Sequence, residues 1–208
     1  MRTATHFEIL VEEPSMEAFL RMFLPRLLRD RSTFAIYPST CKAELLRTIP
    51  QRLRGYVRWL PSEWRIVIVV DRDDDHCAEL KQTLETAISE AGLRSCTSSR
   101  VDRTWQVVSR LAIEELEAWY FGDWAAVRRC FPRVAPSVSA HARYRDPDSI
   151  SGGTWEAFER LLQRAGYHKT GLRKVEVARL LGEACDPAVN RSRSFCAFRD
   201  AILGAASA

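Results

Sequence analysis

Residues 64–73 read WRIVIVVDRD, and this stretch decides the fold class. The run IVIVV at 66–70 consists only of β-branched aliphatic residues, which favour extended structure. A strand without polar alternation is typical of the centre of a parallel sheet, where helices cover both faces. Carboxylates follow at once, at Asp71 and Asp73. We therefore expect a buried central strand that delivers acidic side chains to one edge of a parallel sheet.

Strand-like and helix-like segments alternate on both sides of this run. A strand is predicted at 7–13, FEILVEE, followed by a helix for which Ser15 is the expected N-cap. The other predicted strands are 33–39 and 104–112, and the predicted helices are 16–30, 41–59, 75–91 and 113–131. This alternation predicts an α/β fold with a mainly parallel sheet flanked by helices.

The composition of the chain changes near residue 130. Residues 133–154 are rich in proline, serine, glycine and aspartate, which predicts a long loop with at most one short helix. Helical periodicity returns at 155–166, 173–184 and 194–205. We expect an α/β core over 1–130 and a mainly helical C-terminal part over 131–208 that packs on this core.

Several classes of protein are excluded by the composition. The 208 residues include 46% hydrophobic and 28% charged residues, which is typical of a globular domain. Six cysteines lack zinc-type spacing, and no Walker A, GxGxxG or GxSxG motif is present. The net charge of +4 permits nucleic-acid binding without establishing it. Without a secretory signal or an apolar run of about 18 residues, we expect a cytoplasmic protein with no membrane segment.

Acidic side chains end two of the predicted strands. Glu12 and Glu13 close the first strand, and Asp71 and Asp73 close the central one. The carboxyl ends of parallel strands meet at one edge of the sheet, where α/β folds bind their ligands. Strand alternation points Asp71 and Asp73 to one side and Arg72 away. Carboxylates gathered in this way repel one another unless a cation neutralises them, and Mg²⁺ prefers such oxygen ligands.

A purely structural interpretation of the aspartates is also open. Negative charge stabilises a helix N-terminus, so the run DRDDD at 71–75 can simply begin the next helix. One cap is sufficient for that purpose, and Asp74 or Asp75 can supply it. The second acidic group, after the first strand, favours a metal site over this interpretation.

A third acidic group lies in IEELEAWYFGD, residues 113–123. Glu114 and Glu117 are three positions apart and share one face of the predicted helix. They can supply an outer metal ligand or a general base, or they can form the solvated face of an amphipathic helix. The two interpretations differ in the burial of the carboxylates.

Five segments together resemble a known family. LVEEPSMEAFL at 10–20, VVDRDDDHC at 69–77 and IEELEAWYFGD are similar to a TOPRIM-like family of unknown function, number 4276 in the domain-of-unknown-function series. The segments YRDPDSISGGTWEAFERLLQRAGYHKTGLRK and NRSRSFCAFRDAI agree with the same family. This family is related to the TOPRIM nucleases of the overcoming-lysogenization-defect (OLD) type. The resemblance covers nearly the whole chain and implies a TOPRIM-like sheet with a helical C-terminal extension.

The resemblance also implies a metal site. TOPRIM enzymes hold Mg²⁺ with a glutamate after the first strand and a DxD motif after a later strand. In this sequence the glutamate is Glu12, and the DxD motif supplies Asp71 and Asp73. Mg²⁺ or Mn²⁺ is the expected cofactor. The later lysine of these nucleases falls on Lys174 in GLRK, with Lys169 as the alternative.

One position departs from the nuclease pattern. The first motif of these nucleases resembles VEGxxE, and its second glutamate falls on Met16. Glu13 or Glu17 would have to replace the missing carboxylate. Glu17 lies about 100° around a helix from Met16.

Two hypotheses for function follow from the motifs and the resemblance. The first is a Mg²⁺-dependent nuclease acting on DNA or RNA phosphodiesters, in which Glu114 or Glu117 acts as an outer ligand or base and Lys174 steers phosphate. The second is a non-catalytic TOPRIM subunit that regulates or recruits an ATPase of the ABC or AAA type. The family resemblance implies a phage-defence setting for either.

Overall fold

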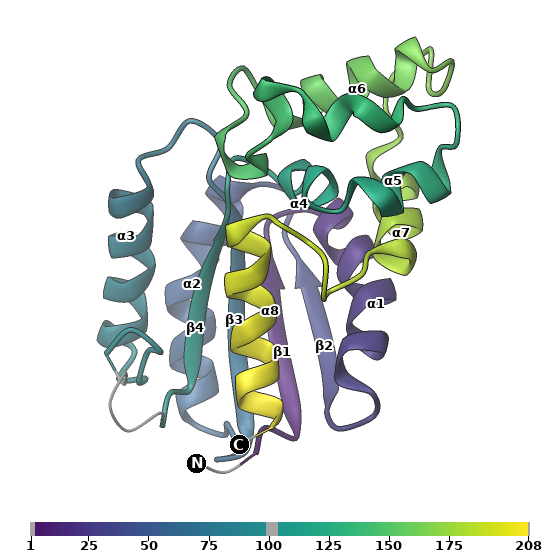
Figure 1. The fold of residues 1–208 in the computed structure, drawn as a ribbon. Coiled ribbons are helices and arrows are strands. Elements are labelled where there is room, and N and C mark those ends of the chain that lie inside the picture. Colours follow the sequence, from purple (N-terminus) through teal and green to yellow (C-terminus); the bar gives the residue numbers. More distant parts are fainter. Residues whose placement is uncertain (1–2, 99–103, 208) are drawn as a thin grey trace.

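A four-stranded sheet organises the molecule in a computed structural model that describes residues 3–98 and 104–207 (Figure 1). All three neighbouring pairs of strands are parallel, which confirms the expected α/β fold. The strands lie in the order β2-β1-β3-β4, with bounds β1 His6–Val11, β2 Thr33–Pro38, β3 Trp64–Asp71 and β4 Val107–Ala112.

Helices follow each of the four strands, and further helices make up the C-terminal third. The helix bounds are α1 Pro14–Leu28, α2 Lys42–Val57, α3 Cys77–Glu90, α4 Glu117–Gly122, α5 Trp124–Cys130, α6 Thr154–Arg164, α7 Lys174–Ala184 and α8 Arg193–Ala206. Three short 3-10 helices, Pro136–Ala140, Ala142–Tyr144 and Pro147–Ser149, occupy the segment predicted as a loop with at most one short helix. No helix among the described residues is long and apolar enough to cross a membrane.

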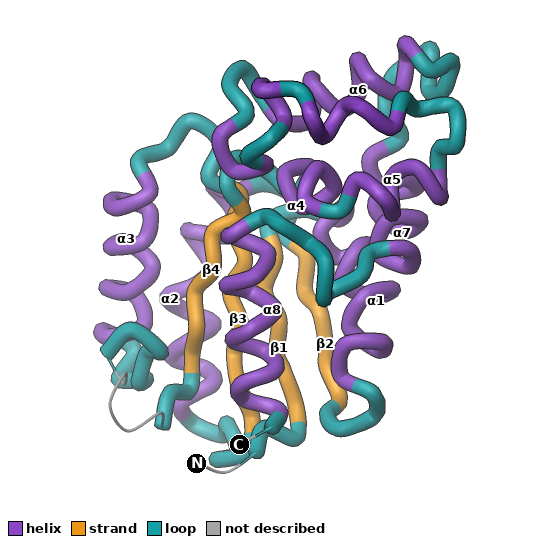
Figure 2. The backbone as a smooth tube through the Cα atoms, viewed as in Figure 1, coloured by secondary structure: helices purple, strands orange, loops and turns teal. Residues whose placement is uncertain are grey.

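Alternate residues of β3 belong to two different hydrophobic cores. Val67 and Val69 pack with side chains of α1 and α8, whereas Ile66, Ile68 and Val70 pack with side chains of α2 and α3. Figure 2 shows the strands lying between these helices. Because both faces of β3 are covered, each of its central residues is apolar, and this explains the unbroken IVIVV run.

The segment from β4 to α8 forms a cap over the C-terminal edge of the sheet. In Figure 1, α4, α5 and α6 lie beyond the tips of the strands, and α7 lies beside α1. The two helices approach closely, because a Cβ atom on Gly182 would lie 2.3 Å from the backbone oxygen of Phe19. The last helix, α8, returns to the sheet, where Phe195, Phe198 and Ile202 join the core on the α1 side. The division into 1–130 and 131–208 stays a prediction.

Two predicted helix starts are wrong. Glu13 rather than Ser15 is the N-cap of α1, because Pro14 fills the first helical position, where its missing N–H costs nothing. α3 begins at Cys77 with His76 as N-cap, so neither Asp74 nor Asp75 caps it. The acidic run is therefore a loop between β3 and α3.

The single helix predicted over 113–131 is two helices. The side chain of Asp123 accepts a hydrogen bond from the Ala126 N–H and caps α5, and this ends α4 at Gly122. α4 begins only at Glu117, so Glu114 lies in the loop before it. The predicted shared helix face of Glu114 and Glu117 is therefore wrong.

Candidate functional site

The tips of β1 and β3 bring the first two acidic groups together. β1 and β3 are neighbours in the sheet, with Val11 opposite Val69. The backbone N–H of Asp71 donates a hydrogen bond to Oε2 of Glu12, at 3.1 Å. The expected meeting of two acidic strand ends at one edge is therefore present in the structure.

Asp71 is the most buried member of this cluster. Its exposed fraction is 6%, and its Oδ1 atom is buried without a hydrogen bond from any residue that the structure describes. Burial raises the pKa of Asp71 well above its ordinary value, and the charges of Glu12, Glu13 and Glu117 add to the effect. An unsatisfied carboxylate oxygen in this position is costly unless a proton or a cation joins it.

Glu12 and Glu13 lie on the same edge, at the entry to α1. Burial raises the pKa of Glu12 to about 7, although the nearby ammonium of Lys42 opposes this effect. The charge of Glu13 acts on Glu12, on Asp71 and on Glu117. Glu13 is thus part of the acidic cluster.

Met16, in contrast, lies inside the hydrophobic core. Its exposed fraction is 2%, and its neighbours are apolar side chains. Glu17 forms an ion pair with Arg21 one turn further along the helix. Of the two possible replacements for the missing carboxylate, Glu13 lies in the cluster and Glu17 is engaged elsewhere.

Asp73 differs from Asp71 although the two residues are close in sequence. Its side chain is 46% exposed, and its backbone adopts a left-handed φ of 48°. Oδ2 of Asp73 lies 2.7 Å from Nζ of Lys42, the first residue of α2. The same ammonium also binds Asp75, at 2.8 Å. Sequence reasoning missed Lys42, which no motif marks.

Arg72 and Glu114 form an ion pair that joins the acidic loop to the end of β4. Backbone hydrogen bonds reinforce the connection, because the Asp73 N–H donates to the Glu114 oxygen, at 2.8 Å. The alternation predicted for Asp71, Arg72 and Asp73 does not apply, because β3 ends at Asp71 and Asp73 has a left-handed backbone. Glu114 therefore holds the loop in place and is neutralised by a guanidinium.

Glu117 and Lys174 lie close enough for the charge of each to shift the pKa of the other. Glu117 is 2% exposed, and burial raises its pKa to about 8 even though Lys174 acts to lower it. Burial alone would lower the pKa of Lys174, but the charges of Glu117, Glu13 and Glu115 outweigh burial and raise it. The Lys174 ammonium also lies 4.9 Å from the ring centroid of Trp155. The structure thus places the predicted lysine beside the acidic cluster.

Tyr120 is a second residue that sequence reasoning missed. Its hydroxyl group is buried and has no hydrogen-bond partner among the described residues. Burial raises its pKa well above the ordinary value, and the charges of Glu117, Glu13 and Asp71 contribute. Its spacing of three residues from Glu117 on α4 was the available signal.

Among the described residues, the predicted ligands do not converge on one complete metal-binding site. Over residues 3–98 and 104–207, no three His, Cys, Asp or Glu groups are arranged to hold one ion. Asp73 is turned toward Lys42 and Glu114 toward Arg72, which leaves Glu12, Glu13, Asp71 and Glu117 as the carboxylates of the cluster.

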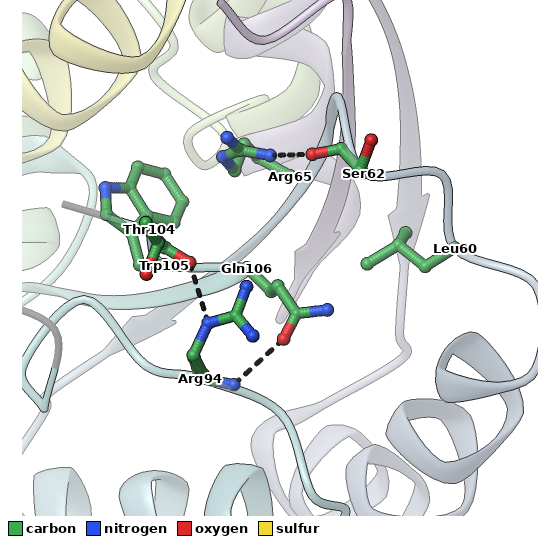
Figure 3. A pocket seen from close by; sticks show the side chains of 7 residues that line it. All are labelled: Leu60, Ser62, Arg65, Arg94, Thr104, Trp105 and Gln106. Atoms are coloured by element: carbon green, nitrogen blue, oxygen red, sulfur yellow. Dashed lines mark hydrogen bonds between the residues drawn. The ribbon is translucent and has the colours of Figure 1, made fainter. Parts of the chain in front are cut away.

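A separate hollow of about 300 Å³ lies near the N-terminal ends of β3 and β4 (Figure 3). Arg65 and Arg94 line it together with Trp105 and Gln106, and Arg65 stacks over the Trp105 ring at 5.6 Å. None of the predicted site residues lines this hollow. The acidic cluster and the hollow are at opposite ends of the sheet.

Most of the chain matches a known protein family. Residues 11–203 match the family described as "Domain of unknown function (DUF4276)". The chain belongs to this family. The match confirms the membership that the acidic motifs and the C-terminal segments indicated.

Among solved structures, the chain is similar to the C-terminal region of the Xanthomonas campestris pv. campestris OLD protein. The identity is 17% and the TM-score is 0.43, over 96% of this chain and 94% of that chain. None of the curated proteins matches the chain.

Proposed function

We propose that this protein is a nuclease-like phosphodiester hydrolase that acts on DNA or RNA with Mg²⁺ or Mn²⁺. The buried, unpartnered Oδ1 atom of Asp71 carries the proposal. It lies in a cluster with Glu12, Glu13 and Glu117, and no guanidinium pairs with Asp71 within the described part of the chain. So much buried negative charge is unfavourable for the protein alone and favourable once a cation is bound.

The donor atoms fit a hard divalent cation. Mg²⁺ is usually bound by one or two carboxylates and completes its shell with water and substrate phosphate. Glu12 and Asp71 would hold it, with Glu13 close enough to contribute charge. When bound, such an ion lowers the pKa of a water molecule and stabilises negative charge on a phosphoryl oxygen. Asp73, the third expected ligand, is bound to Lys42 and would have to leave it to join them.

The remaining residues of the cluster have complementary roles. Lys174 can bind a phosphate oxygen, because among the described residues no carboxylate forms an ion pair with its ammonium. Glu117, with its pKa near 8, can accept or release a proton close to neutral pH, as a general acid or base requires. The buried hydroxyl of Tyr120 can donate a hydrogen bond to a substrate or water oxygen. Glu114 serves as an anchor for Arg72.

The test is hydrolysis of single-stranded DNA, double-stranded DNA and RNA oligonucleotides with Mg²⁺ or Mn²⁺. Wild-type protein is compared with Asp71→Asn and with Asp74→Asn, an exposed aspartate in the same loop that serves as a matched control. Cleavage by wild type and Asp74→Asn, with loss in Asp71→Asn and in EDTA, supports the proposal. Cleavage that persists unchanged in Asp71→Asn contradicts it.

A second candidate function is a non-catalytic subunit that regulates or recruits an ATPase of the ABC or AAA type in phage defence. The burial of Met16 in the core favours it, because the carboxylate of the nuclease motif is lost there. On this hypothesis the protein changes the ATP hydrolysis rate of such a partner, and Asp71→Asn does so equally well. Nucleic-acid cleavage by the isolated chain would decide for the first function.

A further inference from the structure

Lys42 begins α2, the helix that follows β2, and its side chain reaches the acidic edge. β2 is the neighbour of β1, so the connection after β2 opens onto the same edge as Glu12. α2 begins at Lys42, and its side chain extends to the loop that follows β3. The two elements are far apart in sequence and meet only because the sheet order places β2, β1 and β3 side by side.

The ammonium of Lys42 is fully coordinated by oxygen. Nζ lies 2.7 Å from Oδ2 of Asp73, 2.8 Å from Oδ2 of Asp75 and 3.1 Å from the backbone oxygen of Arg72. An ammonium has three N–H donors, so these three oxygens satisfy all of them. Two carboxylates and a carbonyl are also the oxygen types that a hard cation selects.

The acidic edge has two parts. One is the set of three oxygens around the Lys42 ammonium, and the other is the buried carboxylate of Asp71. Asp73 and Asp75 share the positive charge of Lys42, whose side chain is 15% exposed and held in place by both ion pairs. Asp71, in contrast, has a buried oxygen with no hydrogen-bond partner among the described residues. The need for an external cation is therefore concentrated on the β1 and β3 side.

We propose that the ammonium of Lys42 takes the place of a second metal ion, so that the site binds one divalent cation through Glu12 and Asp71. The inference rests on the proposed metal-dependent function and specifies its stoichiometry. A second divalent ion at Asp73 would have to displace a fixed positive charge from its three oxygens, and like charges at short range repel each other. The edge would then hold two cationic groups, the bound metal ion and the ammonium of Lys42.

The experiment counts Mn²⁺ ions per chain by equilibrium dialysis and by electron paramagnetic resonance, without substrate. Wild-type protein is expected to bind one ion. Lys42→Met keeps the length of the side chain and removes its charge, which frees Asp73 and Asp75, so a second ion is expected. Lys42→Arg, which keeps the charge, is expected to bind one ion. Lys81→Met is the matched control, because Lys81 pairs with Glu85 outside the cluster, and it is expected to bind one ion.

Two results would overturn the inference. They are two Mn²⁺ ions in the wild type, or a single ion in Lys42→Met. If Lys42→Met does not fold, Asp73→Asn gives an independent answer in the wild-type background. The inference requires Asp73→Asn to keep one ion with nearly the wild-type affinity, and loss of the ion would overturn it.

Failure of the proposed function gives a different result. If the wild type binds no Mn²⁺, or if Asp71→Asn binds as well as the wild type, there is no metal site on Glu12 and Asp71 at all. In that case both proposals fall. A wild type with two ions that are both lost in Asp71→Asn would leave the hydrolase proposal standing and remove only the role of Lys42.

Discussion

The acidic edge has two sides, each with one lysine, and the two lysines are in opposite situations. On the α2 side, Lys42 donates to three oxygens and has no donor left. On the α7 side, Lys174 lies near several carboxylates and against the Trp155 ring, and no carboxylate of the described residues lies within ion-pair distance of its ammonium. A saturated cation organises the protein, whereas an unsaturated one is available to a ligand.

The carboxylates between these two lysines also fall into a paired group and an unpaired group. Asp73 and Glu114 are paired with basic side chains and hold the loop after β3 in place. Asp71 and Glu117 are almost completely buried, and neither forms an ion pair with a basic side chain of residues 3–98 or 104–207. The contrast teaches that charge count alone does not locate a functional group, since the partner of each carboxylate decides its role.

The largest expected effect belongs to Asp71→Asn. We expect hydrolysis to fall by at least about 100-fold, because even residues that only support metal ligands typically contribute 10- to 100-fold. The metal-free protein should be at least as stable as the wild type, because Asn has a similar shape and cannot ionise in this buried position. Cleavage assays and thermal unfolding in EDTA check the two expectations. A variant that loses both activity and metal-free stability would contradict this interpretation of Asp71.

Lys174→Met should have the next largest effect. We expect about a 10- to 100-fold loss in kcat/KM, which corresponds to the 1.5–3 kcal/mol of a hydrogen bond to a charged group. The number of bound Mn²⁺ ions should stay the same, in contrast to Lys42→Met. Steady-state cleavage kinetics and a metal count on the same preparation measure both. A Lys174→Met variant with an altered metal count and unchanged activity would contradict the roles given to Lys42 and Lys174.

The third prediction concerns the pH dependence of stability without metal. Burial raises the pKa of Glu117 from 4.5 to about 8, and that of Glu12 to about 7. Between the unfolded and folded pKa values the folded protein binds more protons than the unfolded chain, so the free energy of unfolding falls as pH rises from about 4.5 to about 8. Thermal unfolding in EDTA across this range measures the slope.

Glu117→Gln is the matching variant for that experiment. It should flatten the slope, most clearly above about pH 7, where Glu117 alone of the two groups is still titrating. Mn²⁺ should flatten it as well, since a bound cation favours the ionised carboxylates. A slope that Glu117→Gln leaves unchanged would show that other groups produce it.

The smallest effect is expected from Gly182→Ala. The added Cβ would collide with the backbone oxygen of Phe19, so α7 has to shift, at a cost of about 1 to 3 kcal/mol. Because Lys174 begins the same helix, activity should fall while the metal count stays the same. Gly204→Ala, where a Cβ meets no atom within 4 Å, is the control. Chemical denaturation and cleavage rates on both variants test this.

Much of the edge could be predicted from the sequence because strand ends are local features. The IVIVV run identifies a doubly covered strand, and parallel strands necessarily bring Glu12 and Asp71 to one edge. Lys174 was located through the family resemblance, and the structure places it near Glu117. The inferences about β3, Glu12 and Asp71 need only the type of each element and the direction of the strands.

The remaining residues depend on information that a local pattern does not contain. Lys42 reaches Asp73 only because β2 lies beside β1, and strand order is not encoded in the residues around Lys42. The role of Glu114 depends on Arg72, which lies 42 positions away. The sequence around Tyr120 is that of an ordinary core aromatic, and only the packing of distant elements leaves its hydroxyl buried with no hydrogen-bond partner among the described residues. In each case a long-range contact determines what the side chain can do.

The position of α8 has a consequence for how the chain reaches its native state. This helix follows all four strands in sequence, yet it packs on one face of the sheet, where Phe195, Phe198 and Ile202 share a core with residues of β1 and β3. During synthesis, the apolar side chains on that face stay uncovered until α8 has left the ribosome. Contacts between sequence-distant elements form slowly, and an uncovered sheet face is prone to aggregation in the meantime. Chaperone dependence of the nascent protein should therefore last at least until α8 has emerged.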